Sequence, residues 1–291
     1  MIAAIVILTV GLADIAVELS QLFAKPQRAT TRVPVTVAVI VASAVVIAIA
    51  VISTFGLGLP VAATVALALF GLLWVAAASL SRWAGRNVPL LVAALALVAA
   101  VVAGLALSPA LHLKGPLISA FASFSAGAGF GYSLQLTIGA IGVVLFLTQS
   151  MNNICKAALG RALASEPTTE VDPTPNRWDL ILRGRTVATV EKGALAAPAQ
   201  SSGGSPVAAK SGLRGGRVIG PIERLAIAVL ALFGAQPVIV GLLAAKGIVR
   251  FPEIAADGRG GSRAEEFLVG SLVSWSSAGL AALLILVLRN S

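Results

Sequence analysis

Residues 33–55 read VPVTVAVIVASAVVIAIAVISTF and contain no charged side chain. Val and Ile are frequent in this stretch and would favour a β-strand in water. A helix that crosses a lipid bilayer needs about 20 consecutive apolar residues, however, and an unbroken run of this length outweighs the strand propensity. We therefore predict a transmembrane helix here. Six further apolar runs predict the same: Ile2–Phe23, Val61–Leu80, Val88–Leu107, Leu134–Ile154, Ile222–Val249 and Phe267–Leu288.

The composition also indicates a membrane protein. Hydrophobic residues make up 58% of the chain and charged residues 11%, with a mean hydropathy of +0.97, whereas soluble domains carry about 25% charged residues. A water-soluble fold could not cover so many apolar side chains. The expected fold class is an all-α integral membrane protein, a bundle of about seven transmembrane helices (six to eight) with one long polar cytoplasmic linker. Its first partner is then the lipid bilayer.

The net charge of +9 does not indicate a nucleic-acid partner. The basic residues lie mostly between the apolar runs, where the positive-inside rule places them on the cytoplasmic side. Arg is more frequent than Lys, and Ala and Gly are abundant, which is typical of GC-rich bacterial genomes. The expected location is therefore a bacterial plasma membrane. The apolar N-terminus has no basic n-region and predicts a retained first helix rather than a cleaved signal.

Three regions are expected along the chain. Residues 1–155 contain the first five helices, and a small-residue-rich segment at 117–132 is either a closely packed helix or a re-entrant stretch. Residues 156–217 form a polar, partly disordered cytoplasmic linker, within which the alternation at 178–191 suggests a short hairpin. Residues 218–291 contain the last two helices.

The run Ile222–Val249 is interrupted by Gly-Ala-Gln-Pro at 234–237. A continuous helix with a kink at the proline is the favoured interpretation, since proline inside a membrane helix usually produces a kink. That helix would leave the C-terminus in the cytoplasm and the loop 250–264 outside. The alternative is a hairpin of two helices, which returns this loop to the cytoplasm and leaves the C-terminus outside.

Two acids lie inside the first predicted helix. Asp14 and Glu18 are four residues apart and therefore share a helix face. Ionisable residues within a span are costly and usually functional, so one interpretation is a site that handles protons or cations. Their place in the second half of the helix favours the other interpretation, in which both acids meet interfacial water or Lys25.

A second polar group lies on the fifth predicted helix, at spacings of three and four residues. Its members are Gln149, Asn152, Asn153 and Lys156. One interpretation is that they line a pathway or a binding site. The favoured interpretation is hydrogen bonding between helices, with the Lys156 side chain extending to the membrane surface.

The sixth helix is entered through GRVIGPIER (216–224). Glycines allow a tight turn into the membrane, Pro221 suits the first turn of a helix, and Glu223 suits the positive end of the helix dipole. These structural roles explain most of the motif. Arg224 is left over, and we expect it to meet a lipid phosphate, the neighbours of Glu223 or a ligand anion.

Two further motifs follow, AKGIVRFPEI (245–254) and AEEFLVGSL (264–272). Lys246 and Arg250 are four residues apart on one helix face. We expect them to extend to the membrane surface, or to pair with Glu265 and its neighbour Glu266 where the chain re-enters the membrane.

Together these motifs resemble the C-terminal part of a family of uncharacterised bacterial multi-pass membrane proteins. The resemblance covers about 75 residues and rests on the patterns GRxIGxxER, AKxxxRFxEI and AExFLxGSL. Some members carry an N-terminal membrane domain with a His and an Asp, a pattern missing here because no histidine precedes His112. The resemblance brings no known activity. It implies a bacterial membrane location and one shared constellation of charged residues: Glu223, Arg224, Lys246, Arg250 and Glu265.

Several kinds of chemistry are not indicated. Cys155 is the only cysteine and His112 the only histidine, so neither an intrachain disulfide nor a multi-histidine metal site is expected. The Gly-x-Ser-x-Gly nucleophile elbow is also missing from the sequence. We therefore predict no cofactor, no metal and no catalytic residue.

The favoured function is a transporter or channel-type protein, or a subunit of one, because of the membrane acids and the polar face of the fifth helix. One alternative is a non-catalytic scaffold or assembly partner that docks through the cytoplasmic linker. Another is a lipid-active enzyme that uses Glu223, Arg224, Lys246 and Arg250 near a head group. A homo-oligomer or a membrane-protein partner fits each of these hypotheses.

Overall fold

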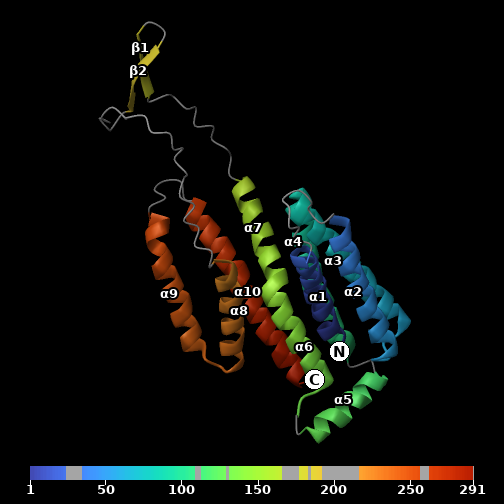
Figure 1. The fold of residues 1–291 in the computed structure, drawn as a ribbon. Coiled ribbons are helices and arrows are strands. Elements are labelled where there is room, and N and C mark those ends of the chain that lie inside the picture. The colour runs from blue at the N-terminus through green and yellow to red at the C-terminus, as the bar shows by residue number, and fades with distance from the viewer. Residues whose placement is uncertain are drawn as a thin grey trace. The chain divides into compact units, whose positions relative to one another are not determined.

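The computed structural model describes residues 1–23, 35–108, 113–128, 131–165, 177–182, 185–191, 216–255 and 262–290. The chain divides into two compact units. The first, Met1–Ala164 with Gly215–Ser291, is an all-α helical bundle (Figure 1). The second, Ser165–Arg214, contains the antiparallel pair β1 (Arg177–Leu182) and β2 (Arg185–Glu191), at the position where the sequence alternation suggested a hairpin.

The helices follow one another along the sequence. The first half of the bundle contains α1 (Ile2–Phe23), α2 (Val35–Phe55), α3 (Val61–Ala84), α4 (Asn87–Leu107) and the short α5 (Pro116–Gly127). The second half contains α6 (Leu134–Leu145), a π-helical turn (Phe146–Ser150), α7 (Met151–Ser165), α8 (Gly216–Leu232), α9 (Gln236–Ala255) and α10 (Ser262–Asn290). Within the described ranges, six segments are long and apolar enough to cross a membrane: α1, α2, α3, α4, α6 joined to α7, and α10.

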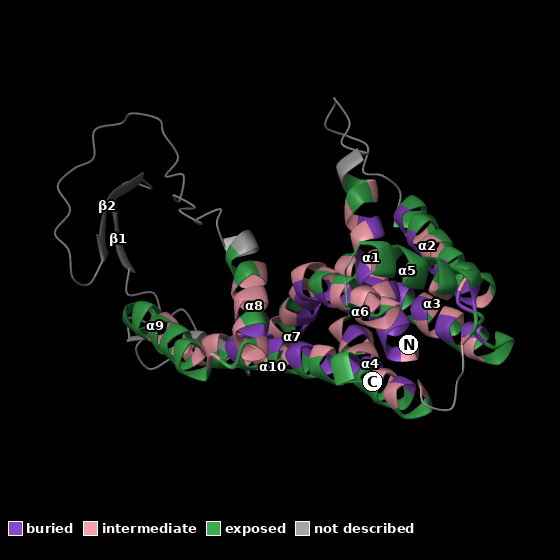
Figure 2. Cartoon of the chain, turned by 90° about the horizontal axis from the view of Figure 1, so that it is seen from below, coloured by how far each residue is buried: buried purple, intermediate pink, exposed green. Residues whose placement is uncertain are grey.

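Helix α1 lies at the centre of the bundle. Of its apolar stretch 67% is buried, against at most 39% for the other five candidate spans, and Figure 2 shows its buried residues surrounded by other helices. Glycines bring its backbone close to α6. A Cβ atom added at Gly142 would lie 2.7 Å from the backbone nitrogen of Leu8, and one added at Gly11 would lie 2.8 Å from the Cβ of Leu145. Small residues at such contacts are typical of helix packing in membranes.

The outer surface of the bundle is apolar. Large side chains such as Ile40, Leu73 and Leu95 are each more than 60% exposed. A soluble protein rarely exposes contiguous apolar surface of this extent. The hydrocarbon core of a bilayer is the solvent in which this surface is stable, so the fold confirms the prediction of a multi-pass membrane protein.

The small-residue segment forms helix α5, which is too short to span a bilayer. None of its residues is buried, and the hydroxyls of Ser119 and Ser123 bond to the helix's own backbone. Of the two interpretations of this segment, the one with close packing through a small-residue face was therefore wrong. The helix is held at its start, where the backbone N–H of Leu117 donates to the carbonyl of Gly56 over 2.9 Å.

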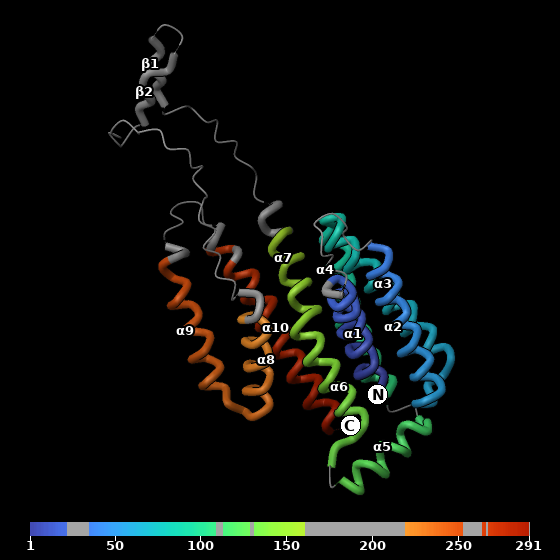
Figure 3. The backbone as a smooth tube through the Cα atoms, viewed as in Figure 1, coloured from blue at the N-terminus to red at the C-terminus, as the bar shows by residue number. Residues whose placement is uncertain are grey.

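The favoured prediction of a continuous helix over 222–249 was also wrong. The chain reverses between α8 and α9, as Figure 3 traces. Gly234 adopts a left-handed conformation with φ +71. The N–H of Ala235 donates to Leu230 O over 2.9 Å, and that of Gly234 donates to Ala231 O over 3.1 Å. This pattern is a Schellman ending, which stops a helix, and Pro237 then suits the first turn of α9.

The reversal sorts the charges to one end of the bundle. Both N and C labels lie at the same end in Figure 1, and α7, α9 and the start of α10 point to the other. In the sequence, the Lys and Arg residues lie either in the connections at this second end or in those halves of the helices that are nearest to it. Lys114 and Arg289 are the exceptions. The positive-inside rule therefore predicts that the second end is cytoplasmic.

This arrangement predicts on which side of the membrane single cysteines react. Phe251 in the last turn of α9 and Arg86 before α4 lie at the charged end, whereas Val61 at the start of α3 lies at the opposite end. In a Cys155→Ala background, we expect Phe251→Cys and Arg86→Cys to share one pattern of labelling by a membrane-impermeant maleimide in intact cells and in inverted vesicles. Val61→Cys should show the reverse pattern. If Phe251→Cys and Val61→Cys shared one labelling pattern, the result would contradict the reversal and support the continuous helix over 222–249.

Candidate functional site

The carboxylate of Asp14 is buried between α1 and α3. The residue is 2% exposed. Trp74 Nε1 donates to Oδ2 over 3.1 Å, and Arg82 Nη2 forms an ion pair with Oδ1 at 3.0 Å. Trp74 and Arg82 reach the same carboxylate because they are eight residues apart on α3, which is about two helical turns. Asp14 therefore meets a protein cation and has little contact with interfacial water, while Lys25, the other partner considered from sequence, lies outside the described residues.

A π-helical turn interrupts the span formed by α6 and α7, directly beside these groups. At its end, the N–H of Met151 donates to the carbonyl of Phe146, five residues earlier in the chain. Single π-turns inside α-helices are rare and often occur at functional sites. The wider turn changes the direction of the side chains at its end. It also changes which backbone carbonyls accept hydrogen bonds within the helix.

Two consecutive residues of this π-turn face the two acids of α1. Gln149 Nε2 donates to Glu18 Oε2 over 3.1 Å. The Ser150 hydroxyl is fully buried beside the Asp14 carboxylate, but among the described residues it has no partner in good hydrogen-bond geometry. The polar core therefore contains one hydroxyl with spare hydrogen-bonding capacity, located next to a buried carboxylate.

Arg224 binds the other side of the same turn. Its side chain extends from α8, and the residue is 2% exposed. Nε donates to the carbonyl of Leu147 over 2.8 Å, Nη2 to Asn152 Oδ1 over 2.5 Å, and Nη1 contacts Cys155 Sγ at 3.9 Å. The planar guanidinium thus satisfies a backbone acceptor in the π-turn and a side-chain acceptor on α7 at once.

A third group joins α8, α9 and α10. Lys246 Nζ lies 2.6 and 2.8 Å from the two carboxylate oxygens of Glu223. Trp275 Nε1 donates to the same carboxylate over 3.2 Å, and its ring lies 5.5 Å from Lys246 Nζ in a cation–π contact. Lys246 therefore pairs with Glu223, and the expectation that it reaches the membrane surface or pairs with Glu265 was wrong.

Most of the residues singled out from sequence meet around the π-turn or next to it. Those brought together are Asp14, Glu18, Gln149, Asn152, Glu223, Arg224 and Lys246. The Asn153 amide nitrogen is buried without a partner among the described residues. Arg250 and Glu265 lie exposed near the end of α9 and the start of α10.

Sequence reasoning missed four members of the site: Trp74, Arg82, Ser150 and Trp275. Trp and Ser are common in apolar helices, and Arg82 was counted only as a loop charge. The available signal was the spacing of Trp74 and Arg82 on one helix face, but nothing in the sequence connects that face with Asp14.

No family model, curated protein or solved structure matches this chain.

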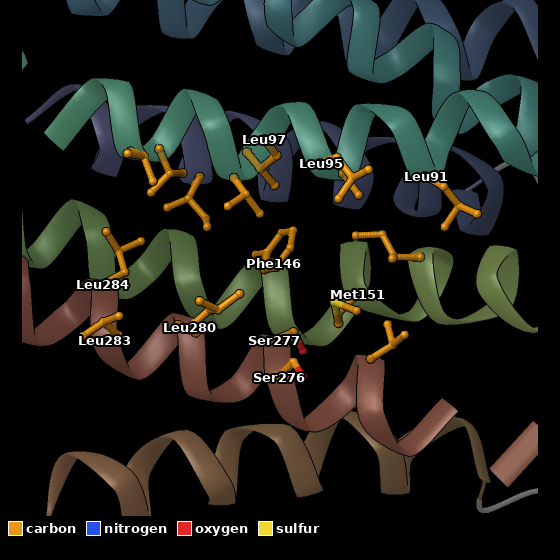
Figure 4. Close-up of a pocket in the computed structure, with 18 of the residues that line it drawn as sticks. Leu91, Leu95, Leu97, Phe146, Met151, Ser276, Ser277, Leu280, Leu283 and Leu284 are labelled. Carbon is orange, nitrogen blue, oxygen red and sulfur yellow. The ribbon is translucent and has the colours of Figure 1, made fainter. Parts of the chain in front are cut away.

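The polar groups do not line the large cavity that the structure contains. That cavity has a volume of about 650 Å³ and is lined almost entirely by apolar side chains, including Leu97, Phe146 and Leu284 (Figure 4). Instead, Asp14 pairs with Arg82 and Glu223 pairs with Lys246, whereas Arg224 donates to uncharged acceptors. Among the described residues, no three His, Cys, Asp or Glu side chains are placed to hold a metal ion. The arrangement can exchange protons between neighbouring side chains.

Proposed function

We propose that this is a transport-type protein of the bacterial plasma membrane, or a subunit of one, in which Asp14 takes up and releases a proton. The observation that carries the proposal is the position of the π-turn. It places Gln149 against Glu18 and Ser150 against Asp14, so that consecutive residues join the two membrane acids. Chains of acids and hydrogen-bonding side chains inside a membrane are typical of proton pathways.

The proton transfer has a direct consequence for packing. When the Asp14 carboxylate accepts a proton, it loses its negative charge and with it the ion pair to Arg82 that joins α1 to α3. The new carboxyl O–H can donate to the Ser150 hydroxyl oxygen, which has no other partner in good geometry among the described residues. Release of the proton restores the ion pair. Protonation therefore removes the ion pair between α1 and α3, leaves the hydrogen bond from Trp74, and adds a contact between Asp14 and the π-turn.

Ser150→Ala tests this role with little effect on folding. The hydroxyl makes no good hydrogen bond among the described residues, so its removal leaves no partner unsatisfied. In proteoliposomes containing a pH-sensitive dye, with an inside-negative potassium diffusion potential, we expect wild type to admit protons faster than protein-free vesicles. A transfer path that loses a hydrogen bond worth about 1.4 kcal/mol slows roughly tenfold, and this is the decrease expected for Ser150→Ala.

Ser79→Ala is the matched control, because the Ser79 hydroxyl bonds to the carbonyl of Val75 within its own helix. It should conduct protons at the wild-type rate. Wild-type vesicles no faster than protein-free vesicles, or equal rates for Ser150→Ala and wild type, would each reject the proposed proton function.

The location and the sequence resemblance belong to the same proposal. The sorting of basic residues to one end of the bundle supports a cytoplasmic linker. The contacts of Arg224 with the π-turn and of Glu223 with Lys246 give a structural reason for the charged pattern shared with the uncharacterised bacterial membrane family. Arg250 and Glu265 have no such role in the proposal.

A further inference from the structure

The 650 Å³ cavity is an open groove between α4 and α10. Helix α4 packs against α1 and α3, whereas α10 packs against α6 and α8. The floor between them is buried, with Leu97 3% and Leu284 5% exposed. The rim is open to the surroundings, with Leu95 73% and Leu272 66% exposed. Figure 4 shows the side chains of both helices facing one another across this space.

The lining excludes polar ligands. Among its members only Ser276 and Ser277 carry a polar side-chain group, and the Ser277 hydroxyl already donates to the carbonyl of Ser274 over 2.7 Å. A charged or strongly hydrogen-bonding ligand would lose its hydration here without gaining partners. The occupant must therefore be apolar along the whole groove.

A membrane offers two kinds of apolar occupant, a transmembrane helix and a lipid acyl chain. The volume of the groove distinguishes between them. A helix with its side chains is about 10–12 Å wide and rises 1.5 Å per residue, so a space of 650 Å³ holds only about one turn of it. A transmembrane helix of about 20 residues would extend far beyond this space and would have to lie over the open rim rather than within the groove. The volume lies within the range of small-ligand sites, about 300–1,000 Å³.

The groove reaches the membrane surface at the charged end of the bundle. Leu91 and Ala158 belong to the lining, and Leu91 is only a few residues from the start of α4. Arg86 precedes that helix, and the exposed Trp83 lies close to it in sequence. Trp and Arg are the residues that meet lipid head groups at a membrane interface. A lipid whose acyl chain lies in the groove therefore keeps its head group at the usual depth in the membrane interface.

We infer that the groove between α4 and α10 binds one acyl chain of a membrane glycerophospholipid from the leaflet at the charged end. The chain passes along α4 and α10 over the buried floor, to which Leu97, Phe146 and Leu284 belong. Lipid tails are as apolar as Leu side chains, so transfer from the bilayer gains little from the hydrophobic effect. The groove therefore holds the chain through its shape. This inference does not depend on proton handling by Asp14.

A photoreactive lipid tests the inference directly. The full-length protein is reconstituted in nanodiscs of phosphatidylethanolamine and phosphatidylglycerol that contain a phosphatidylglycerol with a diazirine in one acyl chain. After irradiation, adducts are mapped by mass spectrometry. We expect adducts at the buried floor residues Leu97, Phe146 and Leu284, in addition to the lipid-facing Ile40 of α2. Labelling of Ile40 with an unlabelled floor would overturn the inference.

Two matched substitutions on α4 provide the control. Ala94 lines the groove, whereas Ala99 lies exposed on the same helix outside the lining. Ala94→Phe should abolish the floor adducts and retain those at Ile40, and Ala99→Phe should leave both unchanged. Floor adducts that persist in Ala94→Phe would count against the groove. A photoreactive amino acid at Leu95 should give lipid adducts; protein–protein adducts there would instead assign the groove to a second copy or another helix.

Discussion

Asp14→Asn is expected to lower the free energy of unfolding by about 3 kcal/mol, because breaking a buried ion pair leaves the partner charge uncompensated. The Asp14 side chain is 2% exposed and that of Arg82 15%, so the guanidinium cannot regain full hydration without moving. Asn keeps a side-chain oxygen that accepts the hydrogen bond from Trp74. The expected loss of unfolding free energy therefore lies at the low end of the range for broken buried ion pairs. Equilibrium unfolding in mixed detergent micelles, followed by tryptophan fluorescence, measures it.

The double variant Asp14→Asn, Arg82→Gln separates folding from function. It removes both charges and should recover most of the lost stability. It should not recover proton flux, because position 14 then has no group that can take up a proton. Glu265→Gln, at an exposed position on α10, is the control and should leave the free energy of unfolding unchanged. A double variant as unstable as the single one would show that the ion pair is not the source of the cost.

Arg224→Ala is expected to have the largest effect, about 4 kcal/mol or loss of the folded protein. The substitution leaves the carbonyl of Leu147 and the side-chain oxygen of Asn152 without their donors in a buried place. It also removes the main polar contact between α8 and the π-turn. Besides the loss of stability, we therefore expect the α8–α9 hairpin to become susceptible to proteolysis while α1–α4 stay protected.

The conservative variant distinguishes geometry from charge. Arg224→Lys retains the positive charge, but a single ammonium cannot reproduce the planar fork that reaches three acceptors. It should recover only part of the stability. Arg289→Ala, exposed at the end of α10, is the control and should unfold like wild type. If Arg224→Lys equals wild type, the charge alone is responsible and the fork geometry is not needed.

Much of the bundle could be predicted because apolar run length is a local property. A run such as 33–55 contains the information for a spanning helix within itself. The reversal at Gly234 was predicted only as the alternative, because the favoured interpretation rested on Pro237, whereas the decisive residue was a glycine three positions earlier. Only the backbone hydrogen bonds of Ala235 and Gly234 show that the helix ends there.

The candidate site was predictable in its members but not in its pairing. Asp14, Asn152 and Arg224 are conspicuous because a polar side chain in an apolar run is costly. Which partner each one meets depends on how helices far apart in sequence pack, and several arrangements satisfy the same charges. The π-turn at Phe146–Ser150 left no signal in the residue pattern, since its five residues resemble any other stretch of a membrane helix.

The α8–α9 hairpin also bears on how the protein is made. With the chain reversing at Gly234, the connections at the N-terminal end of α1 are residues 56–60, 108–133 and 233–235, and Lys114 is the one charged residue in them. If the charged end is cytoplasmic, as the positive-inside rule predicts, the heavily charged segments, including 165–214 and the loop after α9, do not have to cross the lipid during biosynthesis. The helices can therefore enter the bilayer as successive antiparallel pairs, and export of a large hydrophilic domain is not required.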